Sequence, residues 1–175
     1  MDKKFETHIK KIQDHFADSI TKIEEDRVDC PVVCVKKEEA IALLHFIKRT
    51  NGLEYEFLAD LTAYDEMGCP EEKNGRFVVV YNLYSPAQST RIRVKVRLTM
   101  DEEMPTTVGI WSGANWAERE VYDLFGIKFT GHPDLRRILL DVRWEGHPLR
   151  KDYYWRKYQL FTEPEEIPMK LLESD

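Results

Sequence analysis

A run of residues in the middle of the chain alternates between basic and aliphatic side chains without a break. In Arg91–Leu98, every second residue is aliphatic and the residues between are arginine or lysine. This two-residue period predicts a β-strand with one buried and one polar face. Residues 53–63, with apolar odd positions, predict a second strand. Residues 76–84 are nearly all apolar and predict a central strand covered on both faces.

Apolar residues at helical spacing predict three helices. The first covers residues 3–24, the second residues 38–50 and the third residues 115–125. Asn115 is the predicted N-cap of the third helix, with Glu118 completing a capping box, and Gly126 is its predicted end. Residues 31–35 predict one more short strand. The order of elements indicates an α+β domain with a mixed or antiparallel four-stranded sheet and helices packed on it.

Composition limits the class of protein. The chain has 175 residues, a net charge of -6 and a mean hydropathy of -0.52. It carries no apolar run of the roughly 18–20 residues that span a bilayer and no targeting pattern at its N-terminus, so we expect it in the cytosol or on the cytosolic side of a membrane. Cys30, Cys34 and Cys69 lack the spacing of cluster or zinc ligands and predict no metal or other cofactor in this chain.

The chain changes character after residue 130. Four X-Pro pairs interrupt helical periodicity beyond this point, so we divide the chain into an α+β domain, residues 1–130, and an extended partner-binding arm, residues 131–175. Residues 136–157 carry seven basic and three acidic side chains, a balance of +4, with Trp and Tyr between them. Such a segment can bind RNA or a protein. The acidic chain and the absence of an RNA-binding motif favour a protein partner.

Two groups of polar residues could carry chemistry. Glu118 and Glu120 could serve as an acid–base pair, but residues two apart on a helix do not face each other, so we favour capping and ion pairs. Arg119 and Asp123 share a helix face as a predicted i,i+4 pair. His132 and His147 each precede proline and lack a third metal ligand nearby, so hydrogen bonds to turns are favoured over a metal site.

Two long stretches resemble one family. Residues 116–127, WAEREVYDLFGI, and residues 132–139, HPDLRRIL, are similar to the signature of the C subunit of NADH:quinone oxidoreductase, the 30 kDa subunit of respiratory complex I. Residues 145–153, EGHPLRKDY, and residues 60–65, DLTAYD, also resemble this family. The chain departs from it at Tyr154, where the family usually has proline, and its tail is short. The equivalent subunit of a membrane-bound hydrogenase, or of a quinone reductase with another donor, is similar in this region.

The resemblance implies a non-catalytic peripheral subunit of a proton-translocating enzyme on the cytoplasmic side of the cell inner membrane. It implies docking on the large quinone-site subunit, the D subunit of such complexes, and near the cluster-bearing subunits B and I, with FMN, iron–sulfur clusters and quinone held by partner subunits. We expect the arm to extend across the quinone-site subunit, with Arg119 and Asp123 serving assembly. The residues predicted to bind partners are Glu118, Arg119, Glu120, Asp123, His132, Arg136, Arg137, Trp144, His147, Arg150, Lys151, Tyr153 and Trp155.

Overall fold

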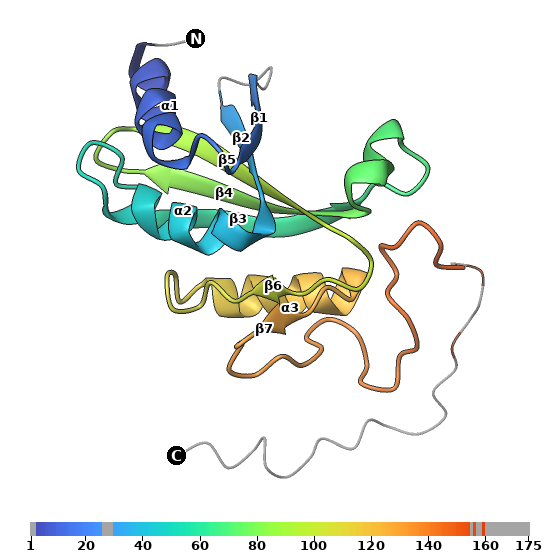
Figure 1. Ribbon diagram of the computed structural model, residues 1–175. Coiled ribbons are helices and arrows are strands. Elements are labelled where there is room, and N and C mark those ends of the chain that lie inside the picture. The colour runs from blue at the N-terminus through green and yellow to red at the C-terminus, as the bar shows by residue number, and fades with distance from the viewer. Residues whose placement is uncertain (1–2, 26–29, 155, 157–158, 160–175) are drawn as a thin grey trace, which may run out of the picture.

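A five-stranded mixed sheet forms the centre of the computed structural model (Figure 1). The structure describes residues 3–25, 30–154, 156 and 159. The order of strands in the sheet is β1-β2-β5-β4-β3, and every neighbouring pair of strands is antiparallel except β2 and β5, which are parallel. This confirms the α+β class. In chain order the elements are α1 (Lys3–Phe16), β1 (Ile20–Glu25), β2 (Pro31–Val35), α2 (Lys37–Arg49), β3 (Phe57–Asp65), the 3₁₀ helix η1 (Pro70–Asn74), β4 (Phe77–Ser85), β5 (Thr90–Leu98), β6 (Met104–Pro105), α3 (Ala114–Phe125) and β7 (Phe129–Thr130).

The fifth strand, β1, corrects the predicted first helix and the predicted number of strands. Helix α1 ends at Phe16, and the chain then forms β1 along β2. Ile20 and Ile23 are three residues apart, a spacing that suggested a helix. The register of β1 shifts between Ile20 and Lys22, so that Ile20 pairs with Val35 and Ile23 with Val33. The shift places both isoleucines on the same face of a strand, which normally requires an even spacing.

Strand β3 also differs from its prediction because of a register shift. It begins at Phe57 rather than Leu53, and its pairing with β4 slips between Leu58 and Asp60. Beyond the slip, the odd positions Leu61 and Ala63 are buried as predicted. Before the slip the faces are exchanged, so Phe57 is 57% exposed while Leu58 packs against the core. One extra residue in a strand is enough to reverse its alternation.

The main core lies between one face of the sheet and the helices. Alternate residues of β5 and β4 meet Leu43, Leu44 and Ile47 of α2, and Val121 and Phe125 of α3 belong to the same buried cluster. Helices α2 and α3 both lie beneath the sheet in Figure 1. No α-helix packs on the opposite face in the described part of the chain, where only the 3₁₀ helix η1 borders the end of the sheet. Strand β4 was predicted to be covered on both faces, and among the described residues α-helices cover it on one of them only.

Two short connections position helix α3. Strands β6 and β7 pair in parallel, which joins the segment after β5 to the segment after α3. The helix begins at Ala114 after Gly113, which makes no side-chain cap, so the predicted N-cap at Asn115 is wrong. The predicted end is confirmed: Gly126 adopts a left-handed φ of 74° and donates its N–H to the carbonyl of Tyr122.

Truncation of the α2 core should destabilise the domain. Leu44 is fully buried, so we expect Leu44→Ala to lower the free energy of unfolding by about 2–5 kcal/mol, through lost burial and the cavity left behind. Urea unfolding followed by circular dichroism measures this. Ile41→Ala, on the half-buried side of the same helix, is the control and should cost clearly less. Equal losses for the two variants would contradict the proposed core.

Candidate partner-binding site

The first half of the arm, residues 131–154, runs beside α3 and reaches the end of the sheet where β3 and β4 meet (Figure 1). After the two residues of β7 it forms turns and bends but no helix or strand. Backbone N–H and C=O groups that leave water need partners, and the turns of this segment supply only some of them. The side chains that supply the others define the site.

Asp123 of α3 is the main acceptor for the arm. Its side chain is fully buried, and its Oδ2 accepts the backbone N–H groups of three consecutive residues, Ile138, Leu139 and Leu140, at 3.0, 2.8 and 2.9 Å. Its Oδ1 accepts Nη1 of Arg137 at 2.6 Å. Burial alone would raise the pKa of Asp123, but these donors outweigh it and the pKa is lowered. The carboxylate therefore stays ionised and holds the arm against α3.

Further side chains of α3 and of the arm donate hydrogen bonds to backbone carbonyls and join the two segments. Arg137 donates to the carbonyls of Asp123 and Gly146 at 3.2 and 2.9 Å. His147 Nδ1 donates to the Asp123 carbonyl at 2.9 Å, and burial lowers the pKa of this imidazole. Arg119 reaches from α3 to the carbonyls of Arg136 and Arg137 at 3.1 and 3.3 Å. Helix and arm are thus joined through groups from both sides.

The arm approaches the C-terminus of α3 closely at Gly126. A Cβ atom at this position would lie within 2.5 Å of the His147 ring and would also meet the Arg150 guanidinium. Arg150 donates from Nε to the carbonyl of Phe125, one of the groups that a helix end leaves without an intrahelical partner. Glycine at this position therefore allows the left-handed conformation that ends the helix and leaves space for the arm to pack closely.

A second junction ties the arm to the sheet. Arg76, just before β4, binds Asp65 at the end of β3 through Nη2 at 2.7 Å, and Asp152 of the arm through the same atom at 2.8 Å. Asp65 also accepts the backbone N–H of Lys151 at 2.9 Å. Burial would raise the pKa of Asp65, but Arg76 and the backbone donors lower it to about 2. No pattern in the sequence distinguishes Asp65, Arg76 or Asp152, because charge counting does not reveal pairs between distant segments.

Glu118 is bound within the domain. It is fully buried, and it accepts the hydroxyls of Thr106 and Thr107 at 2.6 and 2.7 Å and the N–H of Thr107 at 2.6 Å. It thereby fixes the chain before α3, and the predicted capping box is wrong. The predicted Arg119–Asp123 ion pair is also wrong, because Asp123 pairs with Arg137 and Arg119 binds arm carbonyls.

The remaining predicted residues are distributed around the arm. His132 bonds the carbonyl of Asn115 through Nε2 at 3.1 Å, and its Nδ1 accepts the N–H of Asp134 at 3.0 Å, the turn role that was favoured over a metal. Arg136 is exposed and pairs with Asp134. Of the others, Trp144 and Tyr153 are half-buried, Glu120 and Lys151 are exposed, and Trp155 lies outside the described residues.

Apolar side chains project from this bonded framework. Leu139, Val142, Leu149 and Tyr154 of the arm are 60, 62, 51 and 66% exposed, and Trp116 of α3 is 64% exposed. We call these five residues the apolar arm set. Exposed large apolar residues in such number on the arm and the helix beside it are typical of protein interfaces. The aromatic content of the arm is apparent from the sequence, but these leucines and the valine are not distinguished there, because their exposure depends on the fold.

The described residues show neither of two other site types. They contain no group of three or more His, Cys, Asp or Glu side chains arranged to hold a metal ion. Among the helices described, none is long and apolar enough to cross a membrane. The chemistry that this arrangement supports is recognition through an ordered, non-helical arm.

Removing the charge of Asp123 should loosen the arm. Asp123→Asn leaves Arg137 without its carboxylate and gives the three N–H groups a weaker acceptor, so we expect a loss of about 1.5–3 kcal/mol in unfolding free energy. Trypsin should then cut the full chain faster after Arg137 and Arg143, as mass spectrometry of timed digests would show. Asp134→Asn, which alters an exposed pair, is the control and should change neither rate. Unchanged cleavage of the Asp123→Asn variant would contradict the role of Asp123.

The Asp65 junction should make stability depend on acid pH. The pKa of Asp65 is near 3.8 unfolded and about 2 folded, so its contribution is complete above pH 4 and is lost as pH falls toward 2. The difference corresponds to about 2 kcal/mol. Urea unfolding of the wild type and Asp65→Asn at several pH values measures it. We expect the gap between them to shrink from pH 5 to pH 2; a constant gap would contradict the assignment.

Comparisons with known proteins agree on one family. A family described as the 30 Kd subunit of respiratory-chain NADH dehydrogenase matches residues 33–159. The C subunit of NADH-quinone oxidoreductase from Geotalea uraniireducens is 47% identical over 82% of this chain and 84% of its own length. The C/D subunit of NADH-quinone oxidoreductase from Nitrosospira multiformis is 42% identical over 82% of this chain and 25% of its own length.

Solved structures share the fold. A trypsin-resistant fragment of Nqo5 is 31% identical, covers 75% of this chain and 99% of its own, and superposes with a TM-score of 0.66. A chain of an archaeal membrane-bound sulfane sulfur reductase covers 95% of this chain and 100% of its own with a TM-score of 0.72. Its identity is 24%, so this second likeness concerns the fold alone.

Proposed function

The chain belongs to the family of the 30 kDa subunit of respiratory-chain NADH dehydrogenase, and we propose that within its complex it is a non-catalytic docking subunit. Membership makes it a subunit of a complex I-type NADH–quinone oxidoreductase. In our proposal it binds the large quinone-site subunit, beside the cluster-bearing subunits B and I. The observation that carries the proposal is the apolar arm set, five large exposed side chains of which four lie on a segment that the domain itself holds in place and one on α3.

The relative from Nitrosospira multiformis supports the quinone-site subunit as the main partner. That protein is named for both the C and the D subunits, and the part that resembles this chain accounts for a quarter of the polypeptide. A fusion of two subunits in one polypeptide works when the two parts lie close together in the complex. The extended arm offers such a partner a long apolar edge rather than a compact patch, in keeping with a permanent interface.

The arm is better suited to a protein than to RNA. Arg136, Arg137 and Arg143 already pair with Asp134, Asp123 and Asp141 at 2.5, 2.6 and 2.5 Å. These pairs reduce the positive charge available to phosphates, on which binding to nucleic acid depends. The exposed leucines and valine add surface that a protein can bury and a phosphate backbone cannot.

We assign the redox cofactors to partner subunits. In our proposal, the ligands and pockets that bind FMN, iron–sulfur clusters and quinone belong to the partner subunits. Burial raises the pKa of the Cys34 thiol, which disfavours the thiolate that a cluster needs. In this proposal the chain is peripheral, reaches the cytoplasmic side of the inner membrane only through its partners, and assists NADH oxidation by holding the complex together.

Polar substitutions in the apolar arm set should prevent assembly. We expect the double variant Leu139→Asp and Leu149→Asp to fold normally, because both side chains are exposed, but to lower strongly the amount of assembled complex recovered with the quinone-site subunit. Native gels and activity per assembled complex are the measurements. The double variant Leu139→Met and Leu149→Met keeps apolar surface and should assemble normally.

Two outcomes would contradict this proposal. Normal recovery of the quinone-site subunit with the double aspartate variant would show that the apolar arm set does not dock. Normal recovery combined with abolished turnover would point to a catalytic role. Circular dichroism of the isolated variant establishes that any loss of assembly is not a loss of folding.

A further inference from the structure

The face of the sheet opposite α2 and α3 carries a row of cations. Strand β5 directs Arg91, Arg93, Lys95 and Arg97 to this side, at alternate positions over about 20 Å for a rise of about 3.4 Å per residue. Their neighbours across the strands are uncharged. Arg91, Arg93, Lys95 and Arg97 pair with Tyr84, Asn82, Val80 and Val78 of β4, and Arg93 and Lys95 pair with Val32 and Cys34 of β2. We call this the β5 cation row.

Aliphatic side chains lie beneath the cations. Val32, Val78 and Val80 are 2, 0 and 5% exposed, yet they belong to the open face and not to the main core cluster. Arginine and lysine stems cover apolar surface in this way while their charged ends remain near water. The stems of Arg93, Lys95 and Arg97 therefore have buried aliphatic neighbours on this face.

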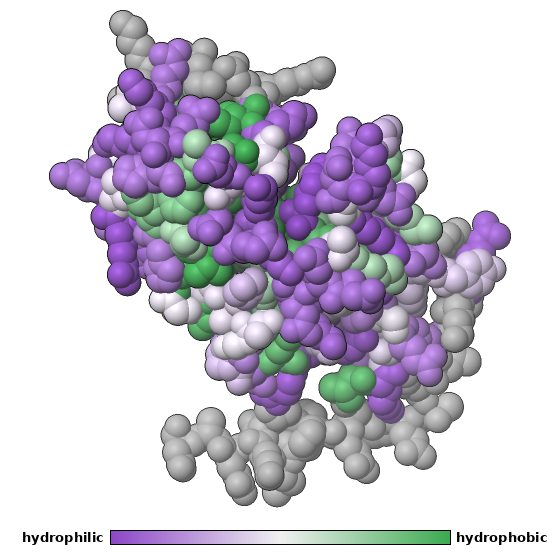
Figure 2. Space-filling model, in the orientation of Figure 1, coloured by the Kyte–Doolittle hydropathy of each residue, from purple (hydrophilic) through white to green (hydrophobic). Residues whose placement is uncertain are grey.

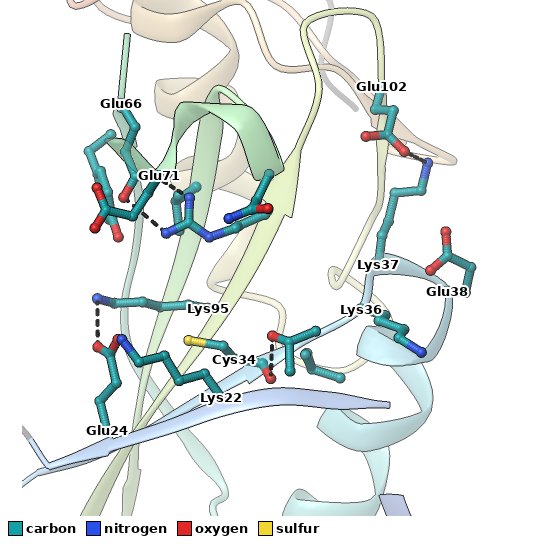
Figure 3. Close-up of a pocket in the computed structure, with 16 residues that line it drawn as sticks. Lys22, Glu24, Cys34, Lys36, Lys37, Glu38, Glu66, Glu71, Lys95 and Glu102 are labelled. Atoms are coloured by element: carbon teal, nitrogen blue, oxygen red, sulfur yellow. Dashed lines mark hydrogen bonds and ion pairs between the residues drawn. The ribbon is translucent and has the colours of Figure 1, made fainter. Parts of the chain in front are cut away.

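The row lines two adjoining hollows. One, of about 640 Å³, lies between β1 and the segment that holds η1, and the other, of about 470 Å³, lies at the end of the sheet near Phe57. Figure 2 shows a hollow between the part of the surface formed near β1 and the part formed near η1. In Figure 3, Lys22, Glu24 and Lys95 meet on one side of the first hollow, while Glu66 and Glu71 lie on the other.

At one end of the β5 cation row, carboxylates of the same chain lie close to the cations. Arg97 pairs with Glu66, and Lys95 lies 4.0 Å from Glu24. At the other end, Arg93 donates from Nε to Oδ1 of Asn82 at 2.8 Å, while Arg91 is exposed and makes no ion pair in the described part of the chain. Arg91 pairs with Tyr84 of β4, and Tyr84 pairs in turn with Phe57 of β3, whose ring is exposed. Arginine with exposed aromatic residues is the composition of an interface hot spot.

We propose that this open face docks an acidic segment of a partner protein, independently of the arm. A carboxylate of that segment meets Arg91, and an apolar side chain of it packs on Phe57 and Tyr84. Charge complementarity supports this occupant: the three middle strands β2, β5 and β4 direct four cations and no acid to this face.

The same observations favour a protein over a polyanion or a lipid surface. The whole chain carries a net charge of -6, which repels nucleic acid and anionic membranes at long range. Glu24, Asp60 and Glu66 also flank the row, so only a narrow ligand that follows β5 avoids them. A peptide segment is such a ligand, and its apolar residue uses the Phe57 end.

A labelled peptide tests the face directly. The probe is Glu-Glu-Leu-Glu-Glu-Phe-Glu-Glu with blocked ends and a fluorophore, titrated with the full chain and followed by anisotropy. We expect binding that weakens as salt rises and is absent for the peptide with glutamine in place of glutamate. Arg91→Glu with Arg93→Glu should weaken it at least about tenfold, and Phe57→Ala should weaken it less.

A charge-matched control makes the result specific. Lys10→Glu with Lys128→Glu changes the net charge equally at exposed sites on α1 and after α3, and should leave binding near the wild-type value. Equal weakening in the two double variants would overturn the proposal. Tighter binding of single-stranded DNA, or of vesicles containing phosphatidylglycerol, with competition at the same arginines, would also overturn it.

The assembled complex gives a second test. A carbodiimide joins amines to carboxylates in contact, so Lys95 should be linked to a glutamate or aspartate of a partner subunit, as mass spectrometry would identify. Links from Lys95 to Glu24 alone would overturn the proposal. The double variant Arg91→Glu with Arg93→Glu should still recover the quinone-site subunit through the arm, so failure here is distinguishable from failure of the proposed arm docking.

Discussion

Two buried carboxylates hold the arm in place by accepting hydrogen bonds from its backbone. Between residues 131 and 154 the chain forms no helix or strand, and where turns do not pair its backbone donors, side chains of the domain accept them. Asp123 accepts three consecutive N–H groups and Asp65 accepts a fourth. Each carboxylate also binds an arginine, Arg137 or Arg76, which offsets the cost of burying its charge. The position of the arm therefore depends on α3 and on the end of β3.

The sequence predicted those parts of the fold in which a local pattern has one structural meaning. The alternation in Arg91–Leu98 and the glycine after α3 each specify one backbone conformation, and both predictions are confirmed. It misassigned β1 because a strand with a register shift can show the spacing of a helix, as Ile20 and Ile23 do. A bulge depends on the pairing of two strands, and pairing partners cannot be read from one segment.

The candidate site was only partly predictable for a related reason. Asp123, Arg137 and His147 stand out as unusual polar residues in a recognisable motif, but their partners are 14 to 24 residues away in the chain. All three bind groups within the chain, and we expect them to influence docking through the shape of the arm. Leu139 and Leu149, which no local pattern distinguishes, are the side chains that remain exposed. That distinction requires the three-dimensional fold.

The two proposed docking surfaces use different physics. The apolar arm set gains free energy mainly by leaving water, which is only weakly affected by salt and suits an interface that stays formed. The β5 cation row acts through charge over a longer range, so it guides encounter and selects acidic partners, and salt weakens it. The sheet separates the two: α3 and the arm lie on its helical side, and the cations face the other. A partner on one surface therefore leaves the other open, which allows a protein of this size to join two neighbours at once.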